Sequence, residues 1–181
     1  IRAITLAHLR PKPGELLWDI GSGSGSIAIE WLRTNLHAKQ IDKTAANTAP
    51  VTAIGIEKDP VRLERARSNA SRLGVPKLTL IEATAPDGLK DLPAPDAIFI
   101  GGGTSNPKIL EIALASLKTG GRIVANAVTI EGEASLIEAF KTHGGELNKI
   151  SVSSAESLGR FKGWRPQMPI TQWIYHKKDQ H

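Results

Sequence analysis

Short apolar segments alternate with amphipathic segments along most of the chain. The apolar segments predict buried strands at 15–20, 51–57, 77–82, 96–100 and 122–128. The amphipathic segments predict helices at 1–9, 26–32, 60–73 and 131–143, and one more that begins at Asn106-Pro107 and is closed by Gly120-Gly121. Strands that alternate with helices of this length are typical of a parallel sheet with helices on both faces.

Two further strands are predicted near the end of the chain, at 146–153 and 170–177, with no helix between them. They are joined by a basic loop that contains tryptophan, and they can pair antiparallel at one edge of the sheet. This ending separates a methyltransferase-type sheet from a plain dinucleotide-binding sheet. We therefore predict an α/β fold with a Rossmann-like, seven-stranded, mostly parallel sheet and an antiparallel edge strand.

The segment 36–50 is polar, rich in alanine and threonine, and has no clear period. We interpret it as a mobile surface insertion. No internal repeat is evident, and the length suits a single domain over 1–181. Because the chain begins at Ile1 inside a predicted helix, without an initiating Met, we interpret it as a piece of a longer protein.

A glycine-serine loop lies between the first strand and its helix, and we predict that it binds a cofactor through Asp19, Gly21, Ser22, Gly23, Ser24 and Gly25. Ligands of open α/β sheets bind at the carboxyl ends of strands, and glycines let the backbone approach them closely. The helix that follows offers free N–H groups to a carboxylate such as that of S-adenosylmethionine. A dinucleotide fingerprint needs a third glycine where Ser26 stands, and no P-loop is present. The alternative is a glycine-rich linker without a ligand.

The ends of the next two strands extend the predicted cofactor site. Glu57 ends the second strand, where a carboxylate can accept hydrogen bonds from both ribose hydroxyls. Lys58 can flank the adenosine, or it is simply a solvated lysine. Thr84 and Ala85 follow the third strand, where the topology places an adenine edge. Asp19 either fixes the glycine loop or reaches the amino end of the cofactor.

The fourth strand ends in Gly101, Gly102 and Gly103. The Asn/Asp-Pro-Pro-aromatic motif of many amine methyltransferases is missing here. Three glycines leave space for a bulky, flat acceptor, so we place Gly101 at the cofactor, Gly102 at the reacting centre and Gly103 at the substrate. A tight strand-to-helix turn is the alternative.

Polar residues after the fifth strand are the candidate catalytic groups. Asn126 and Thr129 can hydrogen-bond an acceptor, or Asn126 ties down a neighbouring segment and Thr129 caps the next helix. The loop 160–166 mixes cations with aromatic residues. Its Arg160, Trp164 and Arg165 can bind carboxylates and stack on a flat ring system, or they serve a subunit interface.

The charge balance is basic, with 23 Lys and Arg against 18 Asp and Glu and a formal net charge of +5. This favours an anionic partner, either a nucleic acid or a polycarboxylate, although a small excess can also serve solubility alone. The chain has no cysteine, its five histidines do not pair at metal-ligand spacing, and no segment has the length of a membrane span. We expect no metal, no membrane contact and a cytoplasmic location.

Five segments together resemble one methyltransferase family, namely GELLWDIGSGSGSIAIEW, IEKDP, PDAIFIGGG, GGRIVANAVTIEGE and GRFKGWRPQMPITQW. They look like the decarboxylating precorrin methyltransferases of cobalamin biosynthesis, and the likeness covers nearly the whole chain apart from 36–50. The IGGG and ANAVT segments are its most specific elements. The chain looks closest to the carboxyl-terminal half of a bifunctional member. One departure is Ala83-Thr84, where the family often has Gly-Asp or Gly-Ala.

The resemblance implies a class I S-adenosylmethionine-dependent methyltransferase whose substrate is a polycarboxylate tetrapyrrole. It implies methylation at carbon 15 with decarboxylation of the acetate arm at carbon 12, an N-terminal methyltransferase domain in the full-length protein, and a homo-oligomer, expected to be a tetramer. Arg160 and Arg165 would then contact substrate carboxylates.

Three other function classes compete with this interpretation. An RNA methyltransferase acting on tRNA would use the same core and a basic surface, but an aromatic content of 4% makes base-stacking platforms scarce. A nicotinamide dehydrogenase conflicts with the glycine spacing. A non-catalytic scaffold domain would tolerate replacement of Glu57. We expect no nucleic-acid partner.

Overall fold

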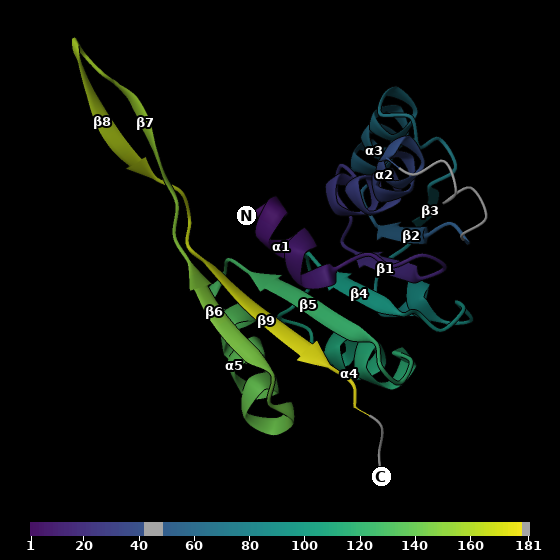
Figure 1. Cartoon of the computed structure of the whole chain (residues 1–181). Coiled ribbons are helices and arrows are strands. Elements are labelled where there is room, and N and C mark those ends of the chain that lie inside the picture. The colour runs from purple at the N-terminus through teal and green to yellow at the C-terminus, as the bar shows by residue number, and fades with distance from the viewer. Residues whose placement is uncertain (42–48, 179–181) are drawn as a thin grey trace.

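The computed structural model describes residues 1–41 and 49–178, with the backbone alone for 35–41. Seven strands form the main sheet in the order β3-β2-β1-β4-β5-β9-β6 (Figure 1). Their bounds, in that order, are Thr79–Glu82, Thr52–Glu57, Leu16–Ile20, Ala97–Ile100, Arg122–Ala127, Ile170–His176 and Glu146–Ile150. The strands are parallel from β3 to β5, and β9 is antiparallel to both of its neighbours. The predicted fold class is confirmed.

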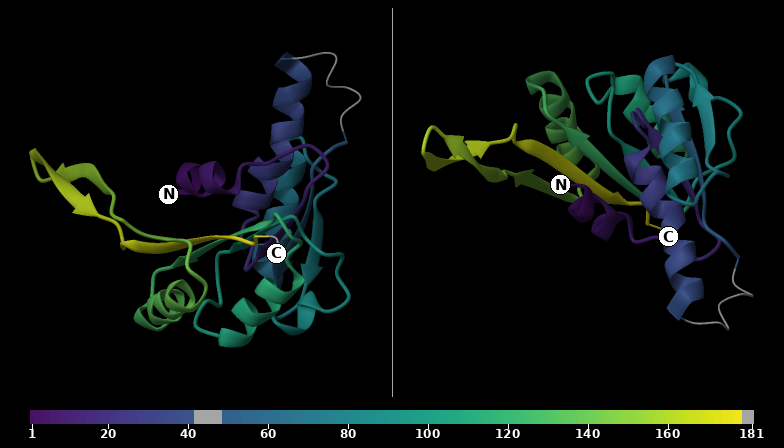
Figure 2. Two further views of the ribbon diagram at one scale, coloured as in Figure 1. Left: turned by 60° about the horizontal axis from the view of Figure 1, so that its bottom comes forward. Right: turned by 90° about the horizontal axis from the view of Figure 1, so that it is seen from above.

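Helices cover both faces of the sheet (Figure 2). One face packs on α1 (Arg2–Leu9), α2 (Ser26–Ile41) and α3 (Pro60–Arg72), and the other packs on α4 (Pro107–Ser116) and α5 (Ile130–His143). A short 3-10 helix, η2 (Asp87–Leu89), follows β3. In the inner strand β1, Leu17 packs in the apolar cluster on the side of α1, α2 and α3, and Trp18 packs in the cluster on the side of α4 and α5. Burial on both faces explains why this strand lacks an alternating pattern, since four of its five residues are apolar and Asp19 is buried among them.

The helix that the sequence predicted at 26–32 is longer than expected. In the structure α2 continues to Ile41, so 36–41 belong to a helix and not to a surface insertion. This stretch contains neither glycine nor proline, which would have ended the helix, although it also lacks the apolar spacing that marks a helix in the sequence. The predicted insertion otherwise falls mostly on 42–48, which lie outside the described residues.

The loop predicted between the last two strands is a β-hairpin. Its strands β7 (Ser153–Leu158) and β8 (Phe161–Pro166) form a separate two-stranded sheet that projects from the body of the molecule (Figure 1). Leu158 pairs with Phe161 across a two-residue turn in which Gly159 has a φ of +59°. The strands escaped prediction because almost every residue in them is exposed, so no buried face imposes an alternating apolar pattern.

The hairpin leaves the sheet at a defined edge. Because β5 and β6 both run antiparallel to β9, they are parallel to each other. The chain therefore enters β7 at the carboxyl edge of the parallel strands. Within residues 1–41 and 49–178, no helix is both long and apolar enough to cross a membrane.

Candidate functional site

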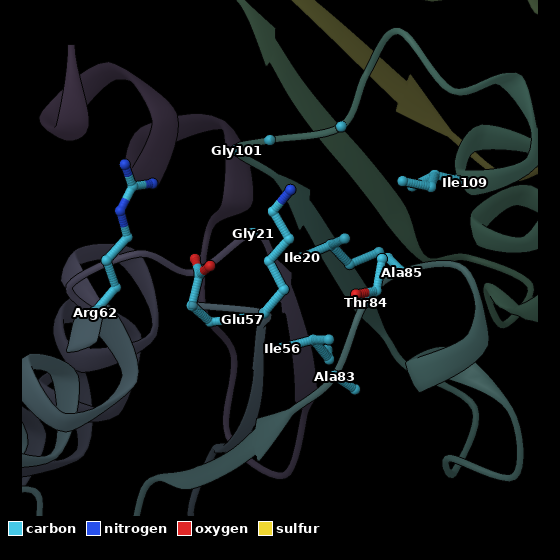
Figure 3. Close-up of a pocket in the computed structure, with 13 residues that line it drawn as sticks. Ile20, Gly21, Ile56, Glu57, Arg62, Ala83, Thr84, Ala85, Gly101 and Ile109 are labelled. Carbon is cyan, nitrogen blue, oxygen red and sulfur yellow. The ribbon is translucent and has the colours of Figure 1, made fainter. Parts of the chain in front are cut away.

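A pocket of about 230 Å³ opens at the carboxyl ends of β1, β2, β3 and β4 (Figure 3). Many of its lining residues were predicted from the sequence to bind the cofactor or the substrate, namely Gly21, Glu57, Lys58, Thr84, Ala85, Gly101, Gly102 and Gly103. Residues from four separate segments of the chain thus meet at one place. The lining residues that sequence reasoning missed are Ile20, Ile56, Arg62, Ala83 and Ile109.

The two glycine segments touch each other through their backbones. Gly21 has a φ of +70°, and a Cβ added to it would lie 2.8 Å from the Gly102 nitrogen. A Cβ on Gly101 would lie 2.7 Å from the Phe99 ring and 3.3 Å from the Gly21 oxygen. Glycines at 21 and 101 are therefore required for the close approach of the β1 and β4 loops. At Gly102 the nearest atom to an added Cβ is 3.8 Å away, so only there is space left over on the pocket floor.

Glu57 is fixed beneath the pocket by two backbone donors. The Gly23 N–H donates to Oε2 at 2.8 Å, and the Asp59 N–H donates to Oε1 at 3.0 Å. The residue is buried, whereas Lys58 beside it is exposed. The carboxylate thus joins the glycine loop to the end of β2, and each of its oxygens keeps a lone pair for a further donor such as a ligand hydroxyl.

Asp19 lies below the same loop and is fully buried. Its Oδ2 accepts a hydrogen bond from the Ala28 N–H at 3.0 Å. Within the described part of the chain, neither its Oδ1 nor the buried Ser22 hydroxyl has a hydrogen-bond partner. Burial raises the pKa of Asp19 to about 7, the Ala28 N–H opposes that rise, and the charge of Glu57 adds to it. Two orphaned polar atoms below a glycine cradle are unusual, because buried polar groups are normally paired.

The lining residues missed from the sequence come from the sheet, from α3 and, in the case of Ile109, from α4. Ile20 is the last residue of β1 and Ile56 the next to last of β2. Ala83 follows β3, and its N–H donates to the Glu57 carbonyl at 3.1 Å. The ends of adjacent parallel strands necessarily meet, so the strand prediction itself contained the signal for these three. Arg62 carried no comparable signal, because its place in the pocket depends on how α3 packs.

Asn126 and Thr129, the two predicted catalytic side chains, have structural partners. The Asn126 amide donates to Thr5 Oγ1 at 3.1 Å and accepts from Gln172 Nε2 at 2.8 Å. Thr129 is the N-cap of α5, where its Oγ1 accepts from the Gly132 N–H at 3.1 Å. These contacts match the structural alternative considered for both residues, and neither residue lines the pocket.

The predicted substrate residues of the 160–166 segment lie on the β7–β8 hairpin and not in the pocket. Arg165 donates to Glu156 Oε2 at 2.9 Å across the hairpin, and the Arg160 guanidinium lies 5.1 Å from the centre of the Phe161 ring. Trp164 is 78% exposed. As for metals, no group of three or more His, Asp or Glu side chains with suitable placement occurs among the described residues.

Comparison with known proteins agrees with this geometry. The family model of the precorrin methyltransferase domain matches residues 1–177. The precorrin-6Y C(5,15)-methyltransferase [decarboxylating] of Sinorhizobium sp is 48% identical over 98% of this chain, which spans only 40% of that protein. A probable cobalt-precorrin-6B C(15)-methyltransferase (decarboxylating) of Pyrobaculum aerophilum is 30% identical over 94% of this chain and 83% of its own length.

A solved structure leads to the same family. The C-terminal domain of precorrin-6Y C5,15-methyltransferase from Rhodobacter capsulatus superposes with a TM-score of 0.83 at 41% identity, covering 97% of this chain and 88% of that one. This chain therefore belongs to the precorrin methyltransferase domain family, on the match of the family model over residues 1–177 and in agreement with its own sheet topology and pocket.

Proposed function

We propose that this chain is an S-adenosylmethionine-dependent methyltransferase that methylates carbon 15 of a precorrin tetrapyrrole and decarboxylates its carbon-12 acetate arm. The observation that carries the proposal is the pocket that joins the glycine loop, Glu57, Thr84–Ala85 and the 101–103 glycines at one edge of the sheet. The names of the relatives supply the precorrin acceptor, methylation at carbon 15 and a decarboxylation, and the family resemblance described above supplies the acetate arm at carbon 12.

The residues of the pocket fit S-adenosylmethionine. Beneath the glycine loop, Asp19 Oδ1 and Ser22 Oγ are buried polar atoms without a hydrogen-bond partner in the part of the chain that the structure describes. Glu57 offers a fixed carboxylate to the ribose hydroxyls, and Ala83, Thr84 and Ala85 offer an apolar wall with one hydroxyl to the adenine. When bound, the cofactor supplies an electrophilic methyl group on a sulfonium.

The chain's own contribution to methyl transfer is mainly to position the reactants. Transfer to carbon is an in-line displacement, and an electron-rich meso carbon needs no strong base to attack. The rigid contact between the Gly21 and Gly102 segments holds the floor of the pocket, and the free space at Gly102 lets a flat acceptor approach. Decarboxylation is favoured where the departing carboxylate is poorly solvated and the ring accepts its electrons.

The full-length protein extends beyond this chain in the proposal. Because the chain spans 40% of the Sinorhizobium relative, a preceding methyltransferase domain that acts at carbon 5 is expected to accompany it. The acceptor is a polycarboxylate, which suits the net charge of +5.

Incubation of the chain with S-adenosylmethionine and the reduced precorrin intermediate, read by mass spectrometry, tests the proposal. The expected product has gained one methyl group and lost one carbon dioxide. Glu57→Gln should lower the affinity for S-adenosylhomocysteine at least about tenfold, since it weakens a charged acceptor at the ribose. Glu64→Gln, an exposed carboxylate on α3 outside the pocket, is the matched control.

Two other outcomes would contradict parts of the proposal. Binding of the cofactor without any change in the mass of the precorrin would refute the acceptor. Methylation of bulk tRNA, with binding that falls steeply as salt rises, would support the competing RNA methyltransferase.

We also propose that the β7–β8 hairpin is a self-association surface of a homo-oligomer. Three side chains of the hairpin and Met168 just after it are 64–78% exposed, namely Leu158, Phe161, Trp164 and Met168, and the hairpin forms its own two-stranded sheet. Leu158 pairs with Phe161 on one face of the hairpin, and Trp164, three residues further along β8, lies on the other face. An isolated two-stranded hairpin is marginally stable in water, and large apolar side chains exposed on both of its faces favour a contact with another surface. A second copy of the chain that covers them would stabilise both hairpins.

Light scattering after size exclusion measures the oligomer directly. The wild-type chain should have the mass of a tetramer, and the double variant Leu158→Ser, Trp164→Ser should have a smaller mass while keeping its affinity for S-adenosylhomocysteine. A monomeric wild-type chain, or a variant with unchanged mass, would refute the interface.

A further inference from the structure

Two cationic side chains, Lys58 and Arg62, line the pocket next to Glu57. Figure 3 shows Arg62 and Glu57 rising side by side from the same side of the pocket. Lys58 belongs to the end of the β2 segment, which is where cofactor contacts were expected. Arg62 comes instead from the first turn of α3, and its position there needs a separate explanation.

The packing of α3 places Arg62 over the glycine loop. A Cβ added to Gly25 would lie 3.2 Å from Ala66 Cβ, and Asn69 Nδ2 donates to the Ser24 carbonyl at 3.2 Å. Residues three and four apart lie on one face of a helix, so Arg62 continues this face by one turn toward the carboxyl edge of the sheet. Its backbone is held there because the N-cap Asp59 accepts from the Arg62 N–H at 3.2 Å.

The charge of Arg62 is only weakly satisfied within the chain. Its Nε lies 3.7 Å from Asp59 Oδ2, in a pair whose side chains are 63% and 43% exposed. Neither terminal nitrogen of the guanidinium has a hydrogen-bond partner in the part of the chain that the structure describes. Among the described residues the ion-pair partner of Arg62 is Asp59 and not Glu57, whose carboxylate is held instead by two backbone N–H groups. The outer edge of the guanidinium is therefore available at the pocket.

We infer that Arg62 is a binding residue for a carboxylate of the molecule held in the pocket. A guanidinium presents two parallel N–H donors to a carboxylate, a geometry that a lysine cannot match. The inference rests on the proposed function, in which two molecules bring carboxylates to this site: the amino-acid end of the cofactor and the side arms of the acceptor. Because Arg62 continues the helix face that contacts Ser24 and Gly25, the carboxylate of the cofactor is the expected partner.

A pair of cofactor analogues distinguishes the two sources. S-Adenosylhomocysteine carries the amino-acid carboxylate, and 5′-methylthioadenosine has the same nucleoside and thioether without it. Calorimetric titration of both ligands into Arg62→Gln should show an affinity for S-adenosylhomocysteine lowered about ten- to a hundredfold, with that for 5′-methylthioadenosine unchanged. A purely structural role would alter both affinities alike.

The same helix provides a matched control. Arg67 forms an equivalent pair with Glu64 three residues away, is 54% exposed and does not line the pocket, so Arg67→Gln should leave both affinities unchanged. If Arg62→Gln leaves both analogues unaffected but raises the KM for the precorrin with kcat intact, the carboxylate belongs to the acceptor.

Two results would overturn the inference. One is an Arg62→Gln variant that matches Arg67→Gln in both affinities and in KM. The other is a wild-type chain that binds neither analogue, which would refute the proposed function itself and is visible before any variant is made.

Discussion

Replacing Asp19 by asparagine should change how the stability of this domain depends on pH. Burial raises the pKa of Asp19 from 3.8 to about 7. The folded state therefore holds the proton more tightly than the unfolded state, and stability is lost as pH rises from the unfolded pKa to the folded one. The difference corresponds to about 4 kcal/mol of unfolding free energy, lost between about pH 4 and pH 7 and constant above that range.

In Asp19→Asn, the pH-dependent loss of unfolding free energy disappears, and a loss that does not depend on pH takes its place. Its amide oxygen can still accept from the Ala28 N–H, but its amide nitrogen replaces an oxygen that has no hydrogen-bond partner among the described residues. The amide carries two N–H donors where protonated Asp19 carries one O–H, so the variant buries one more unpaired donor, which costs about 1–3 kcal/mol relative to the protonated wild type. Asp19→Asn should thus be less stable than the wild type at pH 4 and more stable at pH 8, with the two stability curves crossing between about pH 4.5 and pH 6.

Urea unfolding followed by tryptophan fluorescence measures both free energies, since the chain contains four tryptophans. Comparing the two proteins at each pH cancels the titration of groups that they share. A difference in unfolding free energy that is equal at pH 4 and pH 8 would refute the reasoning, because Asp19 would then titrate alike in the folded and unfolded states.

Two further substitutions test the scaffold of the site. Gly21→Ala should lower the melting temperature and abolish binding of S-adenosylhomocysteine, since its Cβ would lie 2.8 Å from the Gly102 nitrogen. The control is Gly120→Ala, which has a similar φ of +77° but nothing within 4 Å of the added Cβ, and it should keep binding. Equal losses of binding in the two variants would contradict the clash. Arg122→Leu should lower the free energy of unfolding in urea by about 3–5 kcal/mol, because the Glu15 carboxylate, which is only 15% exposed, loses the guanidinium that donates to both of its oxygens. A loss below about 1 kcal/mol, as for an exposed ion pair, would contradict this reasoning.

Much of the pocket could be predicted because its residues lie at the ends of strands that can be recognised in the sequence, and these ends share one edge of the sheet. The glycine loop, Glu57 and the pair Thr84–Ala85 all follow strands of a parallel sheet, and the ends of parallel strands share one edge. Knowing the strands was therefore enough to know that these residues meet. The same reasoning also placed Gly101–Gly103 at the pocket.

The residues that escaped prediction depend on contacts between distant parts of the chain. Buried Gln172 donates to both Thr5 and Asn126, and it is 167 positions from Thr5 in the sequence. No local sequence pattern predicts such a contact. Arg62 reaches the pocket only because Ala66 and Asn69 pack α3 against the glycine loop. Tertiary packing determines which side chains meet in this way, and a short segment of sequence does not reveal that packing.

The sequence by itself determined the order of the five described α-helices and of the seven strands of the main sheet, the α/β class and the position of the glycine loop, because apolar periodicity and glycine spacing are local properties. The tertiary structure alone decided which side chains and backbone groups Asn126 and Thr129 contact, that α2 extends to Ile41, and that 153–166 form a projecting hairpin. It also decided that Asp19 titrates near neutrality, since a pKa depends on the burial that only the folded chain creates.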